Sequence, residues 1–464
     1  MSGIFGVVSQ SNCMDDLFYG TDYHSHLGTE FGGLAIQNGQ VHREIHRIEH
    51  GQFKNLLDGF YRSYAGGMGV GVVSDSDPQP IIVESRFGVC TIVTAGLITN
   101  RDELGRELIQ QGITFNEIQE GRLNQTELVA KMIAQSENIV TGIERVFERM
   151  QGSVSLLLMT REGIYAAGDP HCRLPLAIGT REGTVAAASE TCAFPNLELK
   201  VTKYLRPGEI AFFDSSGLKT AAAPTGAKKT CAFLWIYTGY PASAYEGVSV
   251  ETVREHCGQA LSRKDSVEVD LVSGVPDSGT GHAIGYAMES GRPFRRPLVK
   301  YSAGYGRSYT PPSQEVRDHI AKMKLIPIED ITRGNRLVVC EDSIVRGTQL
   351  RNLTIQKLWN AGAAEVHVRV ACPPLMFPCI YNLSTRSIHE LAARRAIRAL
   401  EGTDLEDVTA YLDPASDQCS RMVEWIREDL NATSLIYLTL DEMYEAIGLP
   451  QCDLCTHCWN GASG

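Results

Sequence analysis

The sequence of 464 residues has no excess of positive charge and no long apolar run. Its 43 Lys and Arg residues stand against 55 Asp and Glu residues, which gives a formal net charge of −12. Binding to nucleic acid or to an anionic membrane surface relies on the opposite balance, so we expect neither as a partner. No apolar stretch approaches the roughly 20 residues that span a bilayer. Because no basic region followed by an apolar stretch opens the chain, we expect a cytoplasmic protein.

Cysteine is the residue type that the chain has in unusual number. There are 13 cysteines, and in a reducing compartment they argue for a metal site or for buried thiols rather than for disulfides. The length is sufficient for two domains, each with its own hydrophobic core.

The clearest local pattern lies between residues 335 and 371. Residues 337–340, Leu-Val-Val-Cys, form a short apolar run that predicts a buried strand. Three leucines then recur near helical spacing up to Gly362, and residues 366–370 alternate like a second strand. A strand–loop–helix–strand unit of this kind builds a parallel α/β sheet.

The loop of this unit begins with two adjacent carboxylates, Glu341 and Asp342. Such a pair can hold sugar hydroxyls, directly or through a divalent cation. The residues that follow offer amide and hydroxyl donors to a phosphate at the start of the helix. They are Ser343, Ile344, Val345, Arg346, Gly347, Thr348 and Gln349. An acidic pair beside an anion site suits a phosphorylated sugar, and the alternative is an ordinary strand-to-helix turn with a capping Asp.

This loop resembles the 5-phosphoribosyl-1-pyrophosphate (PRPP) loop of type I phosphoribosyltransferases. Its core, residues 342–348, resembles one family in particular, the glutamine PRPP amidotransferases (amidophosphoribosyltransferases) of purine synthesis. The resemblance implies an α/β protein with an α+β N-terminal part. Residues 1–228 would form an N-terminal nucleophile hydrolase-like αββα sandwich of the class II glutamine amidotransferase type. Residues 229–464 would form a type I phosphoribosyltransferase parallel-sheet domain with a cysteine-rich tail.

A second loop follows another buried strand and is rich in small residues, which lets the backbone approach an anion closely. In the family this loop receives pyrophosphate, and here it comprises Ser273, Gly274, Val275, Pro276, Asp277, Ser278 and Gly279. The Gly, Ser and Pro content of residues 300–314 predicts a mobile loop, which resembles the family's substrate-covering loop. Arg307 is the candidate pyrophosphate contact and Lys324 a second possible cation; the alternative is a solvent-exposed basic loop.

Three cysteines near the C-terminus, Cys452, Cys455 and Cys458, have spacing suited to a metal or a cluster. The iron–sulfur branch of the family holds its cluster with four thiolates, and the motif matches place them here. They are Cys231, Cys379, Cys455 and Cys458. The resemblance therefore implies a [4Fe–4S] cluster, with structural zinc as the second choice and unligated cysteines as the remaining alternative.

The N-terminal half departs from the family where glutamine would be hydrolysed. Ser2 stands at the place of the family's N-terminal Cys nucleophile, whose own α-amino group is the base. Leu27 replaces an Arg, Ala95 replaces the Asn that donates to the oxyanion, and Gln125 replaces the Asp that binds the amino group. The segment Gly69–Val73 also lacks the Arg that clamps the glutamine carboxylate. One lost oxyanion donor alone costs roughly 3–4 kcal/mol of transition-state stabilisation, so we expect no glutaminase activity.

The leading hypothesis is an amidophosphoribosyltransferase-like enzyme that displaces pyrophosphate from PRPP with ammonia or another amine. Glu341 and Asp342 would hold the ribose hydroxyls and Mg²⁺, and Arg307 would assist the leaving group. The resemblance adds nucleotide effectors, a homo-oligomer (dimer or tetramer) and an ammonia-supplying partner as expectations by analogy. Two alternatives stay open. One is a regulatory paralogue that binds nucleotides or an active amidotransferase subunit, and the other is amide hydrolysis by Ser2, which requires removal of Met1.

Overall fold

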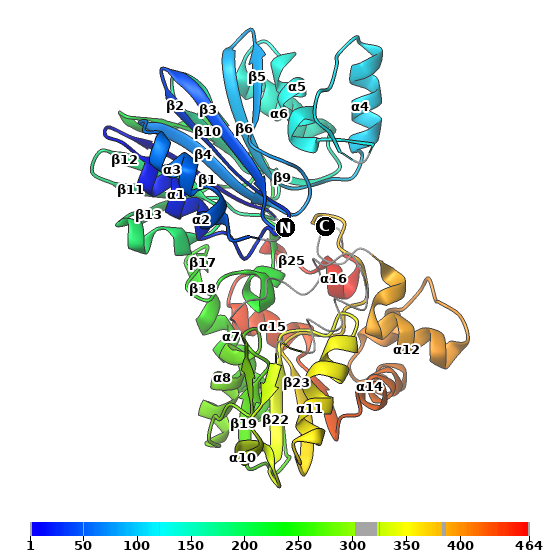
Figure 1. Ribbon diagram of the computed structural model, residues 1–464. Coiled ribbons are helices and arrows are strands. Elements are labelled where there is room, and N and C mark those ends of the chain that lie inside the picture. The colour runs from blue at the N-terminus through cyan, green and yellow to red at the C-terminus, as the bar shows by residue number, and fades with distance from the viewer. Residues whose placement is uncertain are drawn as a thin grey trace. The chain divides into compact units, whose positions relative to one another are not determined.

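The computed structural model describes residues 2–49, 51–119, 121–301, 323, 325–382 and 387–462 (Figure 1). The chain divides into two compact units. The N-terminal unit comprises residues 1–231, 242–247 and 380–384, and the C-terminal unit comprises residues 232–241, 248–379 and 385–464. In the part that the structure describes, no helix is long and apolar enough to cross a membrane.

The N-terminal unit is built on two antiparallel sheets. The first has the order β13 (Lys200–Tyr204), β11 (Ala177–Arg181), β12 (Thr184–Ala188), β1 (Gly3–Ser9), β4 (Met68–Ser74), β2 (Phe31–Asn38), β3 (Gln40–Arg47). The second has the order β15 (Gly217–Ala222), β14 (Ile210–Asp214), β10 (Ile164–Ala167), β9 (Gly152–Met159), β6 (Gly88–Ile98), β5 (Ile81–Ser85).

The other described elements of this unit are short strands and helices. The strands are β7 (Ile118–Gln119), β8 (Arg122–Leu123), β16 (Thr230–Cys231) and β17 (Ala244–Tyr245). The helices are α1 (Met14–Asp22), α2 (Phe53–Leu56), α3 (Asp58–Ser63), α4 (Arg101–Gln110), α5 (Gln125–Ala134), α6 (Ile139–Arg149), η1 (Thr191–Ala193) and η2 (Pro195–Leu197).

Strand β1 shows how the sequence produces the layers, because successive side chains of a strand point to opposite faces. Ile4 and Val8 pack between the two sheets, whereas Phe5 and Val7 pack with Leu17 of α1 on the outer face of the first sheet. Helices α5 and α6 cover the outer face of the second sheet. The predicted αββα sandwich is therefore confirmed.

The C-terminal unit is built on a parallel sheet of the order β19 (Leu271–Gly274), β22 (Arg336–Glu341), β23 (Glu365–Val370), β24 (Ser434–Tyr437). The register aligns Leu271 with Leu337 and Leu337 with Val366. Central parallel strands are covered on both faces, which is why residues 337–340 read as one continuous apolar run. The prediction of a parallel-sheet second domain is confirmed.

Helices and short strands complete the described part of this unit. The helices are η3 (Leu234–Thr238), α7 (Val250–Arg263), α8 (Thr280–Ser290), α10 (Glu329–Thr332), η4 (Leu350–Ile355), α11 (Gln356–Asn360), η5 (Ile388–Glu390), α12 (Ala392–Glu401), α13 (Thr409–Leu412), α14 (Asp417–Leu430), α15 (Leu440–Ile447), η6 (Gln451–Asp453) and α16 (His457–Asn460). The strands are β18 (Val248–Ser249), β20 (Leu298–Lys300), β21 (Leu325–Pro327) and β25 (Leu454–Cys455).

The helix predicted after residue 349 begins as the π-helix η4 and continues as α11. It ends before Gly362, whose φ of +85° is the left-handed conformation expected just past a helix. Helices α12 and α14, which come later in the sequence, pack against one another (Figure 1).

Candidate functional site

The two predicted loops lie side by side because they follow the carboxyl ends of two neighbouring parallel strands, β19 and β22. The Ser278 Oγ donates to Glu341 Oε1 at 2.8 Å and so joins the second loop to the acidic pair. The backbone reinforces the junction, since Val275 N donates to Cys340 O at 2.9 Å. Gly279 lies so close to β22 that a Cβ there would stand 2.1 Å from Cys340 O. The open end of an α/β sheet, where such loops meet, is where ligands bind.

The acidic pair is almost completely buried. Glu341 is 8% exposed and Asp342 is 4% exposed. Burial, and then the negative charge of Asp342, raise the pKa of Glu341 well above its ordinary value. Asp342 is held by the Ser343 hydroxyl, which donates to its Oδ1 at 2.5 Å. Two hard carboxylate groups in this setting gain from a positive charge between them, so they fit a Mg²⁺ ion bound with a substrate.

The loop after the pair has its amide groups available. In the described part of the chain, the backbone N–H groups of residues 344–347 donate to no protein acceptor. Gly347 has a φ of +75°, which lets the loop turn into the helix. Its carbonyl accepts from Arg351 N at 2.9 Å and starts the helical pattern. Several unpaired amides on one tight loop form a site for an anion.

One cation of this region was missed by the sequence reasoning. Lys300, at the end of β20, places its Nζ 2.7 Å from Asp277 Oδ2 of the second loop. Its local signal in the sequence is weak, because it only opens the segment 300–314, which is marked by its Gly, Ser and Pro content. The two cations that were singled out, Arg307 and Lys324, lie outside the described residues.

The cysteines predicted to hold a cluster are divided between the units: Cys231 belongs to the first, and Cys379, Cys455 and Cys458 to the second. The Cys458 carbonyl accepts from Met376 N at 2.9 Å and from Phe377 N at 3.0 Å, so it holds the segment just before Cys379. Among the described residues, no group of three or more His, Cys, Asp or Glu side chains is arranged to hold a metal ion. The cluster and its zinc alternative therefore stay predictions.

In the N-terminal unit, Ser2 is buried and its Oγ donates to Ser74 Oγ at 3.3 Å. That partner is itself engaged, because it accepts from the amides of Ser76 and Asp77 at 3.2 Å. Nearby, His24 is fully buried and burial lowers its pKa to about 4. Its Nδ1 donates to Gly20 O and its Nε2 accepts from a backbone amide, so both ring nitrogens are used internally. The Ser2 hydroxyl therefore contacts another hydroxyl, that of Ser74.

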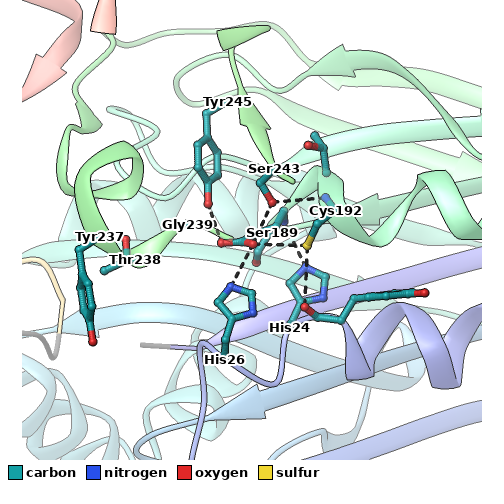
Figure 2. A network of polar contacts seen from close by, with 12 residues as sticks. His24, His26, Ser189, Cys192, Tyr237, Thr238, Gly239, Ser243 and Tyr245 are labelled. Carbon is teal, nitrogen blue, oxygen red and sulfur yellow. Dashed lines mark hydrogen bonds and ion pairs between the residues drawn. The ribbon is translucent and has the colours of Figure 1, made fainter. Parts of the chain in front are cut away.

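A buried polar network surrounds Glu190 of the same unit. His26, Ser243 and Tyr245 contact this carboxylate at 3.0, 2.9 and 2.6 Å respectively. Figure 2 shows these three side chains pointing towards one another. Cys192 Sγ lies 3.4 Å from it. Burial alone would raise the pKa of Glu190, but His26 and the Tyr245 hydroxyl outweigh it and lower the pKa to about 2. The network fixes the segment 242–247, which the sequence reasoning had not connected to this unit.

The residues that the resemblance places at glutamine-binding positions make contacts within the N-terminal unit. Leu27 and Ala95 are buried apolar side chains. Gln125 accepts from Ile98 N at 3.1 Å and donates to Gly96 O at 2.9 Å, so its amide group ties α5 to β6. Asn124 caps α5 by accepting from the amides of residues 126 and 127. Leu27 and Ala95 thus contribute to the packed interior, whereas Gln125 and Asn124 hold α5 through hydrogen bonds.

Comparison with known proteins agrees with this architecture. A family model described as a glutamine amidotransferase domain matches residues 68–196. The amidophosphoribosyltransferase of Methanocaldococcus jannaschii is 30% identical, over 99% of this chain and 97% of that protein. The one from Methanothermobacter thermautotrophicus is 31% identical, over 99% and 93%. The solved structure of the Bacillus subtilis glutamine PRPP amidotransferase, complexed with ADP and GMP, aligns with a TM-score of 0.84 at 28% identity, over 99% and 96% of the two chains.

The fold and these matches define the class: a glutamine amidotransferase-type domain followed in one chain by a phosphoribosyltransferase-type parallel-sheet domain. The coverage is nearly complete in both directions, so no large part of either protein is left unmatched. The chain belongs to the amidophosphoribosyltransferase family.

Proposed function

We propose that the protein transfers the phosphoribosyl group of PRPP to ammonia or to another amine, with release of pyrophosphate. The observation that carries the proposal is the junction of the two loops through Ser278 and Glu341. It places a buried acidic pair between two backbone segments suited to anions. PRPP presents the same order of groups: a phosphate, two ribose hydroxyls and a pyrophosphate.

Each part of the site takes one part of the substrate. The amides of residues 344–347 bind the 5-phosphate, and Glu341 and Asp342 accept hydrogen bonds from the ribose hydroxyls. Residues 273–279 bind the pyrophosphate, with Lys300 beside them. Mg²⁺, when bound, supplies positive charge that keeps the acidic pair ionised and neutralises the leaving group.

In the reaction, the bond between C1 of the ribose and the pyrophosphate oxygen breaks, and the amine nitrogen forms the new bond to C1. The pyrophosphate leaves with the bonding electron pair, and the amine loses a proton. The ribose passes through a cation-like state that the nearby carboxylates stabilise electrostatically. Arg307 and Lys324 are proposed to contact the leaving pyrophosphate.

We also propose that the N-terminal unit no longer hydrolyses glutamine. Its support is the set of substitutions at Leu27, Ala95 and Gln125, together with the internal hydrogen bonds of Gln125. Ammonia then comes from solution or from a partner protein. Nucleotide effectors, assembly into a homodimer or homotetramer and a cytoplasmic location are proposed on the same family grounds.

The transfer is tested by pyrophosphate release from PRPP with Mg²⁺ and ammonium at raised pH. Wild-type protein should release pyrophosphate, and the Glu341→Gln variant, which keeps the shape of the side chain, should be at least about tenfold slower, as expected for the loss of one charged hydrogen bond. Equal rates in the two proteins would contradict the assigned role of the acidic pair. Binding of PRPP without turnover with any amine would favour the regulatory paralogue.

The cluster is a separate proposal, and no step of the reaction passes through it. We propose that Cys231, Cys379, Cys455 and Cys458 bind a [4Fe–4S] cluster that ties down the C-terminal segment. Protein purified without air should contain about four iron atoms and an equal amount of acid-labile sulfide per chain. Zinc without sulfide would point to the structural zinc site instead.

A further inference from the structure

The outer side of the phosphate loop is held by the first turn of α12. The Val345 carbonyl accepts from Ala392 N at 2.7 Å, and the Arg346 carbonyl accepts from Arg395 Nη1 at 3.0 Å. Two consecutive loop carbonyls therefore face the same helix. All of these residues belong to the C-terminal unit.

This contact determines where the loop amides point. In a trans peptide the C=O and the following N–H lie in one plane and point in opposite directions. Because the carbonyls of Val345 and Arg346 face α12, the N–H groups of Arg346 and Gly347 face away from it. These are the amides that donate to no protein acceptor in the described chain, and in the proposed function they bind the 5-phosphate.

The guanidinium of Arg395 is itself fixed from behind by α14. Its Nη2 donates to Asp429 Oδ2 at 3.3 Å, and it lies over the ring of Trp425, 5.6 Å from the centroid. The other oxygen of Asp429 accepts from Arg351 Nη1 at 2.9 Å, on the helix that follows the loop. Arg395 thus joins the loop to the packed pair of helices α12 and α14.

We infer that Arg395 is a positioning residue for the 5-phosphate of PRPP, acting through the carbonyl of Arg346. The inference rests on the proposed function, because it takes the loop to be the phosphate site. Arg395 does not touch the substrate. It holds two peptide planes in the orientation that binding needs, so the loop does not have to be ordered when the phosphate arrives.

The 5-phosphate is remote from the bond that breaks, so the loop binds it equally in the ground state and in the transition state. Weakening such uniform binding raises KM and leaves kcat unchanged. A loss of general structure would lower kcat as well. Pyrophosphate alone binds the other loop, residues 273–279, which Arg395 does not contact. The ratio of the two ligand affinities therefore separates positioning from damage.

The experiment measures binding of ribose 5-phosphate and of inorganic pyrophosphate, each with Mg²⁺, by calorimetry. The full-length proteins are wild type, Arg395→Met, Arg395→Lys and Arg398→Met. Arg398 is the matched control, since it lies one turn further along α12 and pairs with Asp404 and the His389 carbonyl instead of the loop. Arg395→Met should bind ribose 5-phosphate about tenfold more weakly, about 1.4 kcal/mol, with pyrophosphate binding unchanged.

The other two variants test whether the effect is specific to Arg395 and to its guanidinium group. Arg398→Met should bind both ligands like wild type. Arg395→Lys should be intermediate, because one ammonium cannot contact both Arg346 O and Asp429 as a guanidinium does. In turnover with ammonium, KM for PRPP should rise about tenfold in Arg395→Met, with kcat within about twofold of wild type.

Unchanged ribose 5-phosphate binding by Arg395→Met would overturn the inference, and so would equal weakening of both ligands. Wild-type protein that binds neither ligand would overturn the proposed function itself, and the inference with it. If wild type binds both ligands and Arg395→Met binds only ribose 5-phosphate more weakly, the result supports the proposed function and the inference.

Discussion

Glu341 can lose its charge without losing its hydrogen bonds. Its Oε1 accepts from Ser278 Oγ and from Asp342 N, and the oxygen of a Gln side chain can accept from both. A carboxyl whose pKa is raised by folding, as burial and Asp342 raise that of Glu341, stabilises the fold below its ordinary pKa. This stabilisation is lost as the pH rises through the higher pKa of the folded state.

The Glu341→Gln variant should therefore be more stable than wild type at pH 7.5, when neither Mg²⁺ nor PRPP is present. The difference should shrink towards pH 4, below the ordinary pKa of 4.5, where the wild-type carboxyl is mostly protonated in both states. Urea unfolding at the two pH values measures it. A variant that is less stable than wild type at pH 7.5 would contradict the assigned cause of the pKa shift.

Tyr245 supplies one of the hydrogen bonds that keep Glu190 ionised while buried. Tyr245→Phe should cost about 1–3 kcal/mol, because it leaves a buried carboxylate with one donor fewer. The pKa of Glu190 is depressed, so its contribution is present above the ordinary pKa of 4.5 and is lost as the pH falls towards about 2. The variant should therefore begin to unfold at a higher pH during acid titration.

The matched control is Tyr61→Phe, which removes a comparable bond to the exposed carboxylate of Asp15. Water replaces that partner, so little change is expected. An equal shift of the acid transition in both variants would contradict the role of the Tyr245 hydrogen bond in keeping buried Glu190 ionised.

At the scale of elements, the parallel sheet of the C-terminal unit contains a buried ion pair. Arg369 of β23 and Asp265, which follows α7, are 0% and 1% exposed in their side chains. Tyr286 of α8 donates to the same carboxylate at 2.8 Å. The three residues come from three elements, so the pair fixes how these elements pack.

Arg369→Met should destabilise the C-terminal unit by about 3–5 kcal/mol, since it leaves the Asp265 charge buried without its partner. Arg336→Met is the control, because it removes an Arg–Asp pair of β22 that is well exposed to solvent. Thermal unfolding should show a clear fall in Tm for the first variant and little change for the second. Similar Tm values for the two variants would exclude the proposed role of burial.

Elements with a continuous local signal could be predicted from the sequence. Strands β22 and β23 follow apolar or alternating runs, and the loop 341–349 has an unusual combination of residues over a short stretch. The start of the following helix as the π-helix η4 gave no such signal. Its i to i+5 hydrogen bonding depends on how the loop enters the helix, and residue propensities do not report on that entry.

At the scale of the whole molecule, sequence motifs were sufficient to predict the order of the two domains. They were not sufficient to predict contacts between residues that are distant in sequence. Ser278 and Glu341 are 63 positions apart, and Tyr245 and Glu190 are 55 apart. Such pairs arise from strand order and from the path of the chain, here the return of residues 242–247 to the N-terminal unit. Predicting them requires the topology first. The domain boundary at residues 228–229 and the oligomeric state stay predictions.

In the proposed function the C-terminal unit transfers the phosphoribosyl group, whereas the N-terminal unit no longer hydrolyses glutamine. The N-terminal unit has a complete layered core, so the proposed loss of glutaminase activity would leave the fold of the domain intact.

The most direct test compares glutamine with ammonium as nitrogen source in the same assay of pyrophosphate release from PRPP. The account predicts release with ammonium and none above background with glutamine, together with no formation of glutamate. Pyrophosphate release with glutamine at a rate similar to that with ammonium, accompanied by glutamate, would contradict it.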